Sequence, residues 1–248
     1  MPTALSVNLN KIALLRNSRE GNYPNVIDFA QQAIDAGAKG LTIHPRPDQR
    51  HIRPRDVHEL NALCEKQATI EFNIEGNPFE GELGDYPGFM ALVEATRPDQ
   101  ATLVPDNNDQ LTSDHGFDLI KDGQALVPVI KQLQEWGVRI SLFMDPDIAQ
   151  IKEAKTLGAD RIELYTGPYA AHFGSAQHSA TLAIYREAAL YAHSIGLAVN
   201  AGHDLSLTNL AEFLTIPHIA EVSIGHALTV EALEKGYKNT VSAYSKIC

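Results

Sequence analysis

The chain has few cysteines and no long apolar run. Two of its 248 residues are cysteine: Cys64, within an expected helix, and Cys248, the last residue. Two cysteines so placed offer neither a disulfide framework nor the spacing of metal ligands. No apolar stretch approaches the roughly 18 residues that a transmembrane helix needs. We therefore predict no disulfide scaffold, no metal site and no membrane span.

The sequence is also poor in positive charge. It carries 20 Lys and Arg against 31 Asp and Glu, which gives a formal net charge of −11. Nucleic acids and anionic membrane surfaces require a basic face, so this balance argues against both as partners. The N-terminus lacks the basic, apolar and small-residue order of a secretory signal, and we expect a cytoplasmic protein. An anionic small substrate would need locally concentrated basic groups.

Short strand patterns alternate with helical patterns along the chain. Helical stretches end in Gly37, Gly137, Gly158 and Gly196 just before a strand, as expected for left-handed helix caps. We predict strands at about 4–9, 40–44, 69–74, 100–105, 138–143, 160–165, 197–201 and 219–224. This order predicts an α/β fold, a (β/α)8 barrel with extra short helices, formed by residues 1–248 as a single domain. A doubly wound open sheet is the alternative, but no Gly-x-Gly-x-x-Gly turn follows any strand.

Apolar and polar residues alternate in most of the predicted strands. In a barrel, the apolar set packs beneath the helices and the polar set points inward. Arg139, Arg161 and Glu221 lie early in their strands and are expected to form a buried ion-pair network. Polar residues late in strands, or just after them, are expected to open into a site, because such barrels place their active sites at this end.

Several residues late in strands, or just after them, are therefore site candidates. They are Asn8, Asn10, His44, Glu71, Asn73, Glu163, Asn200, His203, Gly225 and His226. Two carboxylates and three histidines predict acid–base catalysis, because one group takes a proton while another donates one. For Glu71 and Glu163 the alternative is a carboxylate neutralised by a barrel arginine such as Arg161.

The strand that ends at His44 leads into a basic loop. Arg46, Arg50 and His51 follow within a few residues, and prolines at 45 and 47 stiffen the segment. Imidazole transfers protons near neutral pH, and guanidinium binds phosphate. The segment predicts a functional site around His44, with an exposed basic loop as the alternative.

The last two predicted strands each end in a Gly–His pair. Gly202 and His203 follow one strand, and Gly225 and His226 follow the next and open a helix. Barrels often bind phosphate between these two loops, with a helix N-terminus supplying positive charge. A second anion site is predicted from Lys11, Arg16, Arg19, Arg46 and His51. Solvated helix charges are the alternative for the two arginines after the first strand.

Long loops at 75–86, 106–117 and 167–179 are candidate lids or oligomer contacts.

The sequence resembles the pyridoxine 5′-phosphate synthase family of the deoxyxylulose-dependent vitamin B6 pathway. The resemblance runs over nearly the whole chain. It rests on residues 7–13 and 15–19, His44 with Arg46, residues 50–52, Glu71, and residues 103–105, 162–167, 199–203 and 224–227. These segments, in this order, are highly specific.

The resemblance implies a (β/α)8 barrel that assembles into a homo-octamer. The implied enzyme is a transferase-class synthase that condenses 1-deoxy-D-xylulose 5-phosphate with 3-amino-2-oxopropyl phosphate. Its products are pyridoxine 5′-phosphate, phosphate and water. Its partners are therefore two phosphorylated small molecules, and no metal or organic cofactor is implied.

The resemblance also implies roles for individual residues. His44 and Glu71 resemble proton acceptors, His203 a proton donor and Glu163 a transition-state stabiliser. Contacts to the aminoacetone phosphate are implied for Asn8, Arg19, Gly225 and His226. Contacts to deoxyxylulose phosphate are implied for Arg46, His51 and Thr112.

The chain departs from the family pattern at three candidate substrate contacts. Many members carry Asp-His where this chain has Asn10 and Lys11, and Asp204 replaces a glycine after His203. Lys11 can donate to phosphate but cannot shuttle a proton at neutral pH as histidine does. The carboxylate of Asp204 would repel phosphate if it faced the site.

Two other functions are weighed against the synthase. A metal-dependent hydrolase or isomerase would use His44, His203, His226 and a glutamate, but the sequence lacks a His-x-His pair at a strand end. A non-catalytic phosphate sensor on the same barrel is the second, since fold alone does not guarantee chemistry. Binding phosphate would require neither Glu71 nor His203, which favours an enzyme.

Overall fold

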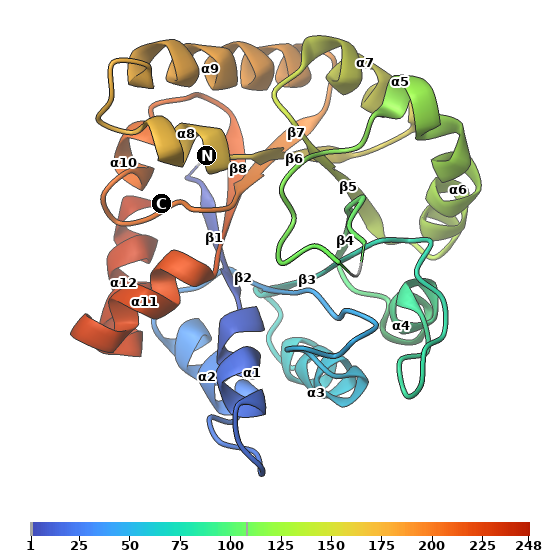
Figure 1. Cartoon of the computed structure of the whole chain (residues 1–248), viewed down its shortest axis with the longest axis vertical. Coiled ribbons are helices and arrows are strands. Elements are labelled where there is room, and N and C mark those ends of the chain that lie inside the picture. The colour runs from blue at the N-terminus through green and yellow to red at the C-terminus, as the bar shows by residue number, and fades with distance from the viewer. Residues whose placement is uncertain (1, 108) are drawn as a thin grey trace.

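A closed ring of parallel strands forms the centre of the molecule (Figure 1). The structure, a computed structural model, describes residues 2–107 and 109–248. The strands are β1 (Ala4–Asn8), β2 (Gly40–Ile43), β3 (Glu71–Gly76), β4 (Gln100–Leu103), β5 (Arg139–Met144), β6 (Arg161–Tyr165), β7 (Ala198–Gly202) and β8 (Ile219–Ile224). Because β8 pairs with β1, the sheet is a closed barrel and not an open doubly wound sheet. The predicted (β/α)8 barrel is confirmed.

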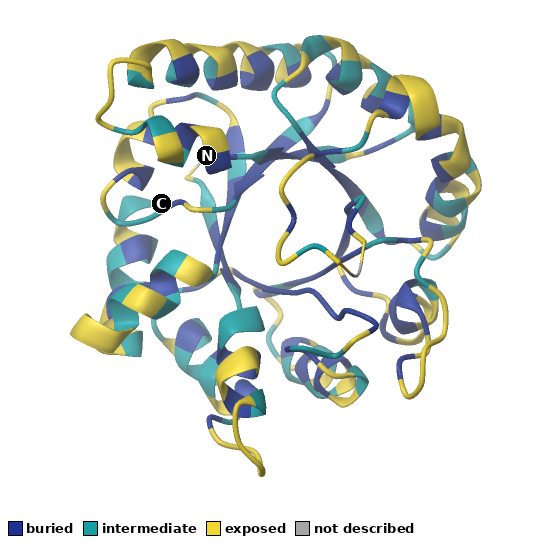
Figure 2. Ribbon diagram, viewed as in Figure 1, coloured by how far each residue is buried: buried dark blue, intermediate teal, exposed yellow. Residues whose placement is uncertain are grey.

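Helices surround the barrel and bury the faces that point toward it (Figure 2). They are α1 (Asn10–Asn17), α2 (Val26–Asp35), α3 (Pro54–Cys64), α4 (Phe89–Thr96), α5 (Leu119–Asp122), the 3-10 helix η1 (Gly123–Leu126), α6 (Val127–Glu135), α7 (Ile148–Leu157), α8 (Gly167–His172), α9 (His178–Ser194), α10 (Leu210–Phe213), α11 (His226–Lys235) and α12 (Tyr237–Ile247). The expected left-handed cap is seen at Gly158, whose φ is +98°. Among the described residues, no helix has the length and apolar character to cross a membrane.

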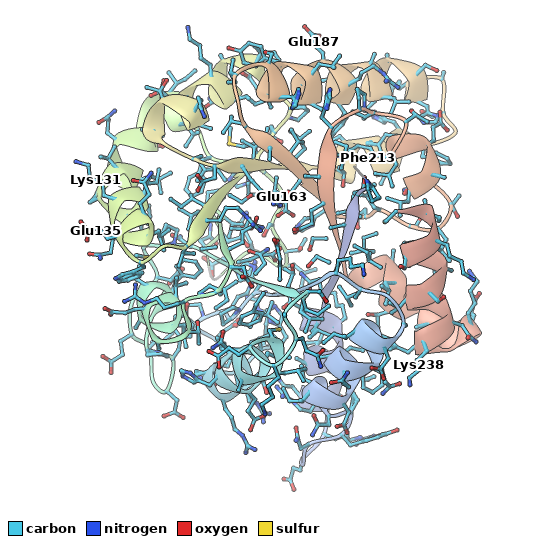
Figure 3. The ribbon with its side chains drawn as sticks, turned by 180° about the vertical axis from the view of Figure 1, so that it is seen from behind. Lys131, Glu135, Glu163, Glu187, Phe213 and Lys238 are labelled. Atoms are coloured by element: carbon cyan, nitrogen blue, oxygen red, sulfur yellow. The ribbon has the colours of Figure 1, made fainter. Side chains whose placement is uncertain are left out.

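The inside of the barrel is polar and hydrogen-bonded, as the alternating pattern predicts. The hydroxyls of Ser6 and Thr42 are 2.7 Å apart, and Asn73 Nδ2 donates to Thr42 Oγ1 at 3.3 Å. Thr102 Oγ1 in turn donates to Asn73 Oδ1 at 3.1 Å. From behind, Glu163 lies inside the ring of strands, whereas Lys131 and Glu135 project outward from α6 (Figure 3). Ser6, Thr42, Asn73 and Thr102 thus satisfy one another away from water.

Ion pairs fill the N-terminal end of the barrel. Arg161 Nη1 lies 3.4 Å from Glu221 Oε2 and donates to Asn200 Oδ1 at 3.1 Å. Arg139 at the start of β5 forms a salt bridge with Glu71 at the start of β3. Of the buried ion-pair network predicted for Arg139, Arg161 and Glu221, the Arg161–Glu221 pair is confirmed, whereas Arg139 pairs with Glu71, whose side chain is 45% exposed.

Strand β3 begins two residues later than predicted. It starts at Glu71 because Ile70 still belongs to a turn, in which its backbone N–H donates to Gln67 O at 3.0 Å. Glu71 therefore stands at the N-terminal end of the barrel, and the predicted position of Glu71 late in its strand is wrong. Glu75 lies on the same face of β3, about 13 Å further toward the C-terminal end at the usual rise per residue.

A buried ion pair fixes the elements beneath the basic loop. Arg16 Nη1 lies 2.5 Å from Asp56 Oδ1, and Nη2 lies 2.8 Å from Oδ2. The same guanidinium donates to His51 O at 3.0 Å, while Asp56 accepts from the N–H of Arg53 at 2.8 Å and caps α3. Arg16 is thus neither an anion ligand nor a solvated helix charge, and both expectations for it are wrong.

We predict that Arg16→Met lowers the free energy of unfolding by about 3–5 kcal/mol, because the buried carboxylate of Asp56 loses its partner. Urea unfolding followed by circular dichroism measures the change. Arg55→Ala is the control, since Arg55 forms an exposed pair with Glu59 and such pairs add little stability. Equal unfolding midpoints for the two variants would contradict the role of the buried pair.

Candidate active site

Two adjoining cavities open at the C-terminal ends of the strands. The larger has a volume of about 290 Å³ and the smaller about 110 Å³. Six residues line both cavities: Asn10, Lys11, Glu75, Leu111, Thr112 and His203. The two cavities therefore share a wall that contains a carboxyl, an imidazole and an ammonium group.

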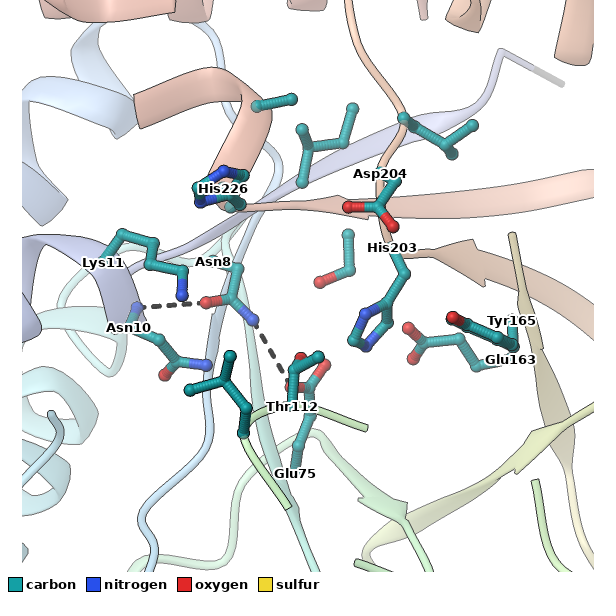
Figure 4. A pocket seen from close by; sticks show the side chains of 16 residues that line it. Asn8, Asn10, Lys11, Glu75, Thr112, Glu163, Tyr165, His203, Asp204 and His226 are labelled. Carbon is teal, nitrogen blue, oxygen red and sulfur yellow. Dashed lines mark hydrogen bonds between the residues drawn. The ribbon is translucent and has the colours of Figure 1, made fainter. Parts of the chain in front are cut away.

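The larger cavity lies between β1, β7 and the start of α11. Gly225 and His226 line it at the first turn of α11, where backbone N–H groups and the helix dipole favour an anion. A Cβ on Gly225 would lie 3.0 Å from Asn8 Cβ, so only glycine fits comfortably beside the end of β1. Figure 4 shows Lys11 and His226 on one side of this cavity and Glu163 with Tyr165 on the other. This arrangement suits a phosphate at the helix end.

The smaller cavity is basic. His44, Arg46, Arg50 and His51 line it together with Lys11. Arg46 pairs with the buried Asp106, and Arg50 Nη1 donates to Gln110 O at 2.8 Å. The two arginines thereby hold the predicted loop 106–117 against the cavity. Residue 108 of this loop lies outside the described residues. A doubly charged phosphate would meet several cations here.

Hydrogen bonds between side chains and backbone connect the two cavities. Asn10 Oδ1 accepts from the backbone N–H of His44 at 2.8 Å, and Asn8 Oδ1 accepts from the N–H of Asn10 at 3.0 Å. Asn8 Nδ2 donates to Glu75 Oε2 at 3.4 Å. Asn10 therefore fixes the backbone that carries His44, a task that an asparagine performs through its carbonyl oxygen.

Three of the four histidines that line the cavities, His44, His51 and His203, favour their neutral form. Burial and the positive charge of Arg46 lower the pKa of His44 well below its usual value, and burial lowers the pKa of His51 to about 3. The N–H of Ile52 donates to His51 Nδ1 at 3.0 Å, which requires a lone pair on that nitrogen. Burial also lowers the pKa of His203. Each neutral imidazole keeps one ring nitrogen with a free lone pair, which can accept a hydrogen bond or a proton from a bound substrate.

The two carboxyls at this end are shifted in the opposite direction. Burial raises the pKa of Glu75 well above its usual value, and the charge of Glu163 adds to this shift. Burial, with a contribution from Glu221, raises the pKa of Glu163 to about 8. Among the described residues, Glu163 Oε2 is buried without a hydrogen-bond partner. Glu163 therefore keeps its proton near pH 7, and burial shifts Glu75 in the same direction, so protonated carboxyls stand beside neutral imidazoles.

The structure brings together most of the residues that the sequence analysis proposed. The residues that line one or both cavities are Asn8, Asn10, Lys11, His44, Arg46, His51, Thr112, Glu163, His203, Asp204, Gly225 and His226. Asn73 and Asn200 line neither cavity and are hydrogen-bonded to other side chains inside the barrel. Two further proposed residues also lie elsewhere. Arg19 is exposed after the end of α1, and Glu71 pairs with Arg139 at the opposite end of the barrel, where a side-chain hydrogen bond from that arginine lowers the pKa of Glu71.

Two further residues of the site, Glu75 and Tyr165, are not among the candidates predicted from the sequence. Glu75 lines both cavities, and Tyr165 lines the larger one beside Glu163. The alternation that points Glu71 and Asn73 inward also points Glu75 inward, so the face of Glu75 was readable from the sequence. The sequence did not show how far along the strand, toward its C-terminal end, each residue lies.

Fold and site together define a (β/α)8 enzyme with acid–base groups between two anion-binding cavities. The model of the family described as pyridoxal phosphate biosynthesis protein PdxJ matches residues 5–248. The chain belongs to the PdxJ family.

Curated relatives support this assignment over their full length. A pyridoxine 5′-phosphate synthase of Xanthomonas campestris pv. campestris (strain B100) is 55% identical over 248 residues, 100% of this chain and 96% of the relative. One from Xylella fastidiosa (strain M23) is 52% identical over 246 residues, 99% and 94% of the two chains. Similarity of this extent shows that the chain has the synthase function of its family.

More distant solved structures share the fold alone. The Amycolatopsis orientalis BexX/CysO complex contains a chain that aligns with a TM-score of 0.63 at 16% identity, covering 99% of this chain and 88% of that one. A 4-hydroxy-2-oxoglutarate aldolase/2-deydro-3-deoxyphosphogluconate aldolase from TTHB1 aligns with a TM-score of 0.60 at 14% identity, covering 98% and 93%. At such identities the likeness carries no function.

A metal-dependent mechanism would need a compact ligand set. Across residues 2–107 and 109–248, no three His, Cys, Asp or Glu side chains form a group that could hold a metal ion. In that part of the chain, His44, His203 and His226 therefore do not form the three-ligand set that the metal-dependent alternative requires.

The raised pKa of Glu163 predicts a pH-dependent gain in stability for Glu163→Gln. The native carboxyl keeps its proton up to about pH 8, whereas the unfolded one loses it near 4.5. Between these values the unfolded state binds fewer protons, so this group costs stability as pH rises. We expect the melting temperature of Glu163→Gln to exceed that of the wild type at pH 9, with the gain shrinking toward pH 5. A gain that does not depend on pH would contradict the shift.

Proposed function

We propose that this chain condenses 1-deoxy-D-xylulose 5-phosphate with 3-amino-2-oxopropyl phosphate in the paired cavities. The products are pyridoxine 5′-phosphate, phosphate and water. The observation that supports this best is the shared wall, because Glu75 and His203 line both cavities. Two phosphorylated substrates bound in separate cavities would meet at these two proton-transfer groups, which lowers the entropic barrier to bond formation.

Each cavity suits one substrate. The larger one receives the aminoacetone phosphate, whose phosphate lies at the start of α11 near Gly225 and His226, with Asn8 as a further contact. The smaller one receives deoxyxylulose phosphate, held by Arg46, His51 and Thr112. Lys11 reaches both and supplies a cation to whichever phosphate lies nearer. Arg19, exposed in this structure, would reach substrate only after a movement of the segment behind α1.

Asp204, Asn10 and Lys11, the positions at which the chain departs from the family pattern, each have a role in this proposal. Asp204 lines the larger cavity, and its backbone N–H serves better than its carboxylate, which would repel phosphate. Asn10 holds the backbone of His44 at 2.8 Å and faces both cavities. Lys11 provides charge where other members provide imidazole, so proton transfer at this position passes to other groups.

Glu75 takes the acid–base role first assigned to Glu71. Imine formation, dehydration, phosphate loss and ring closure each need a proton delivered or removed beside the substrates. A protonated Glu75 delivers the first proton, and the carboxylate that results takes the next one. His44, which is neutral in the free protein, accepts a proton from the substrate. An incoming phosphate adds negative charge beside His203, which raises the pKa of its imidazole and makes it a proton donor.

Glu163 stabilises positive charge that develops on the substrate. It lies within the larger cavity, and its carboxyl packs so closely on Gly202 that a Cβ there would lie 2.3 Å from Glu163 Oε1. In a water-poor pocket, the dipole of this protonated carboxyl, with its carbonyl oxygen toward the substrate, stabilises a developing iminium charge. The group needs no metal and no organic cofactor to act in this way.

We further propose that the chain assembles as a homo-octamer in the cytoplasm and binds neither nucleic acid nor membranes. Exposed apolar side chains such as Leu233, 80% exposed on α11, fit subunit contacts. Sedimentation is expected to give a particle eight times the 27.1 kDa mass of the chain. A monomer or dimer at micromolar concentration would contradict this assembly.

We predict that Glu75→Gln lowers kcat by about 10²–10⁴-fold, the usual contribution of a general acid–base group. Metal-free protein is incubated with both phosphorylated substrates while inorganic phosphate and the pyridinol absorbance are followed together. Glu71→Gln is the matched control, since it removes a carboxylate of the same strand and face outside both cavities. Its kcat is expected to stay within a few-fold of the wild type.

Three outcomes would count against the proposal. A greater loss in Glu71→Gln than in Glu75→Gln, with both variants folded, would return the catalytic role to Glu71. Phosphate binding without any turnover by the wild type would favour a sensor. Activity that appears only after metal is added would favour the metal-dependent alternative.

A further inference from the structure

Strand β7 ends in a backbone bend that few residue types adopt. His203 has a φ of +80° and Asp204 a φ of +57°, and neither is glycine. Consecutive left-handed residues with side chains cost free energy, and they persist where neighbouring groups fix them. The bend turns His203 from the end of β7 into the wall that both cavities share.

The residue that fixes the first half of this bend is Thr166. It follows β6 directly and is fully buried. Its backbone N–H donates to Gly202 O at 2.8 Å and continues the pairing of β6 with β7. Its hydroxyl lies 2.5 Å from Gly202 O and also within hydrogen-bond distance of His203 O. A hydroxyl has one proton, so it donates to one of these carbonyls at a time and holds both close.

A second side chain fixes the other half of the bend. Asn209 Nδ2 donates to Asp204 O at 3.1 Å, and Asn209 Oδ1 accepts from the N–H of Ser206 at 2.8 Å. Tyr169 Oη donates to Asn209 O at 2.8 Å and holds this residue in turn. The backbone carbonyls of His203 and Asp204 therefore each lie within hydrogen-bond distance of a buried side-chain donor.

Aromatic rings set the direction of the imidazole once the backbone is placed. The ring of His203 lies 5.2 Å from that of Phe143 and 5.4 Å from that of Tyr165, measured between centroids. Both contacts are tilted or edge-on. The rings limit sideways movement, whereas the depth of the imidazole in the cavity depends on the backbone bend.

We propose that Thr166 is a positioning residue for His203. Its hydroxyl holds the bend that places the imidazole between the two cavities, although Thr166 lines neither of them. The inference rests on the proposed function, in which His203 transfers a proton to substrate. Thr166 acts through His203 and touches no reacting atom.

Thr166→Val tests this role because it removes the hydroxyl and keeps the branched shape. We expect kcat to fall about 100-fold, since a shift near 1 Å in a catalytic group has effects of this order. The KM of each substrate should change little, because the phosphate contacts remain. The limb of the kcat against pH profile that depends on His203 should move in Thr166→Val. Thr166→Ser keeps the hydroxyl and should restore kcat and the profile.

Thr240→Val is a matched control for the loss of a buried hydroxyl. Thr240 is also fully buried, and its hydroxyl donates to Gly236 O at 3.0 Å in α12, away from the cavities. This variant should lose stability as Thr166→Val does but keep its kcat. Equal losses of kcat in Thr166→Val and Thr166→Ser, or an unchanged kcat in Thr166→Val, would overturn the inference.

A readout apart from activity separates this inference from the proposed function. Crystal structures of the wild type and Thr166→Val should differ in the φ of His203 or in the position of its imidazole. If the wild type shows no turnover, the proposed function fails while this comparison still tests the positioning. An unmoved His203 in Thr166→Val would overturn the positioning role whatever the activity.

Discussion

Removal of charged groups from water is the constraint on which the rest of this structure depends. Closure of the barrel turns a row of polar side chains from every strand into a space with little solvent, where each must find a partner or change its protonation. Glu71 and Glu75 show both solutions on one face of β3. Arg139 pairs with Glu71 and lowers its pKa, whereas burial raises the pKa of Glu75. Glu71 at the N-terminal end of the barrel is therefore held in an ion pair, whereas Glu75 at the catalytic end favours its neutral, protonated form.

This division explains how a protein with a net charge of −11 can act on anionic substrates. Positive charge is concentrated around the smaller cavity, where Arg46, Arg50 and Lys11 gather, and the first turn of α11 serves the larger one. Neutral carboxyls between them do not repel phosphate as carboxylates would. The same burial that shifts the pKa values thus also permits two phosphates to bind near two glutamates.

The fold was largely predictable because its signals are local. Alternating polarity marked the inward face, and β8 (Ile219–Ile224) begins and ends where the sequence pattern places it. The error at β3 arose because Thr69 and Ile70 favour strands but are held in a turn by Gln67. A shift of two residues keeps the same face, so the pattern could not reveal that Glu71 lies at the N-terminal end of the barrel.

Other features depend on contacts between residues distant in sequence and on backbone angles, which the sequence pattern does not show. Arg16 and Asp56 are 40 residues apart, and the role of Thr166 depends on the φ of His203.

The central claim is that Glu75 and Glu163 carry protons in the free protein at neutral pH. Carbon-13 NMR of protein labelled at the glutamate side-chain carboxyls measures this directly. The account predicts two carboxyl signals that remain at the protonated position at pH 7, one absent from Glu75→Gln and the other from Glu163→Gln. The signal of Glu71 should already be that of a carboxylate. Titration of both buried glutamates near the ordinary value of 4.5 would contradict the account.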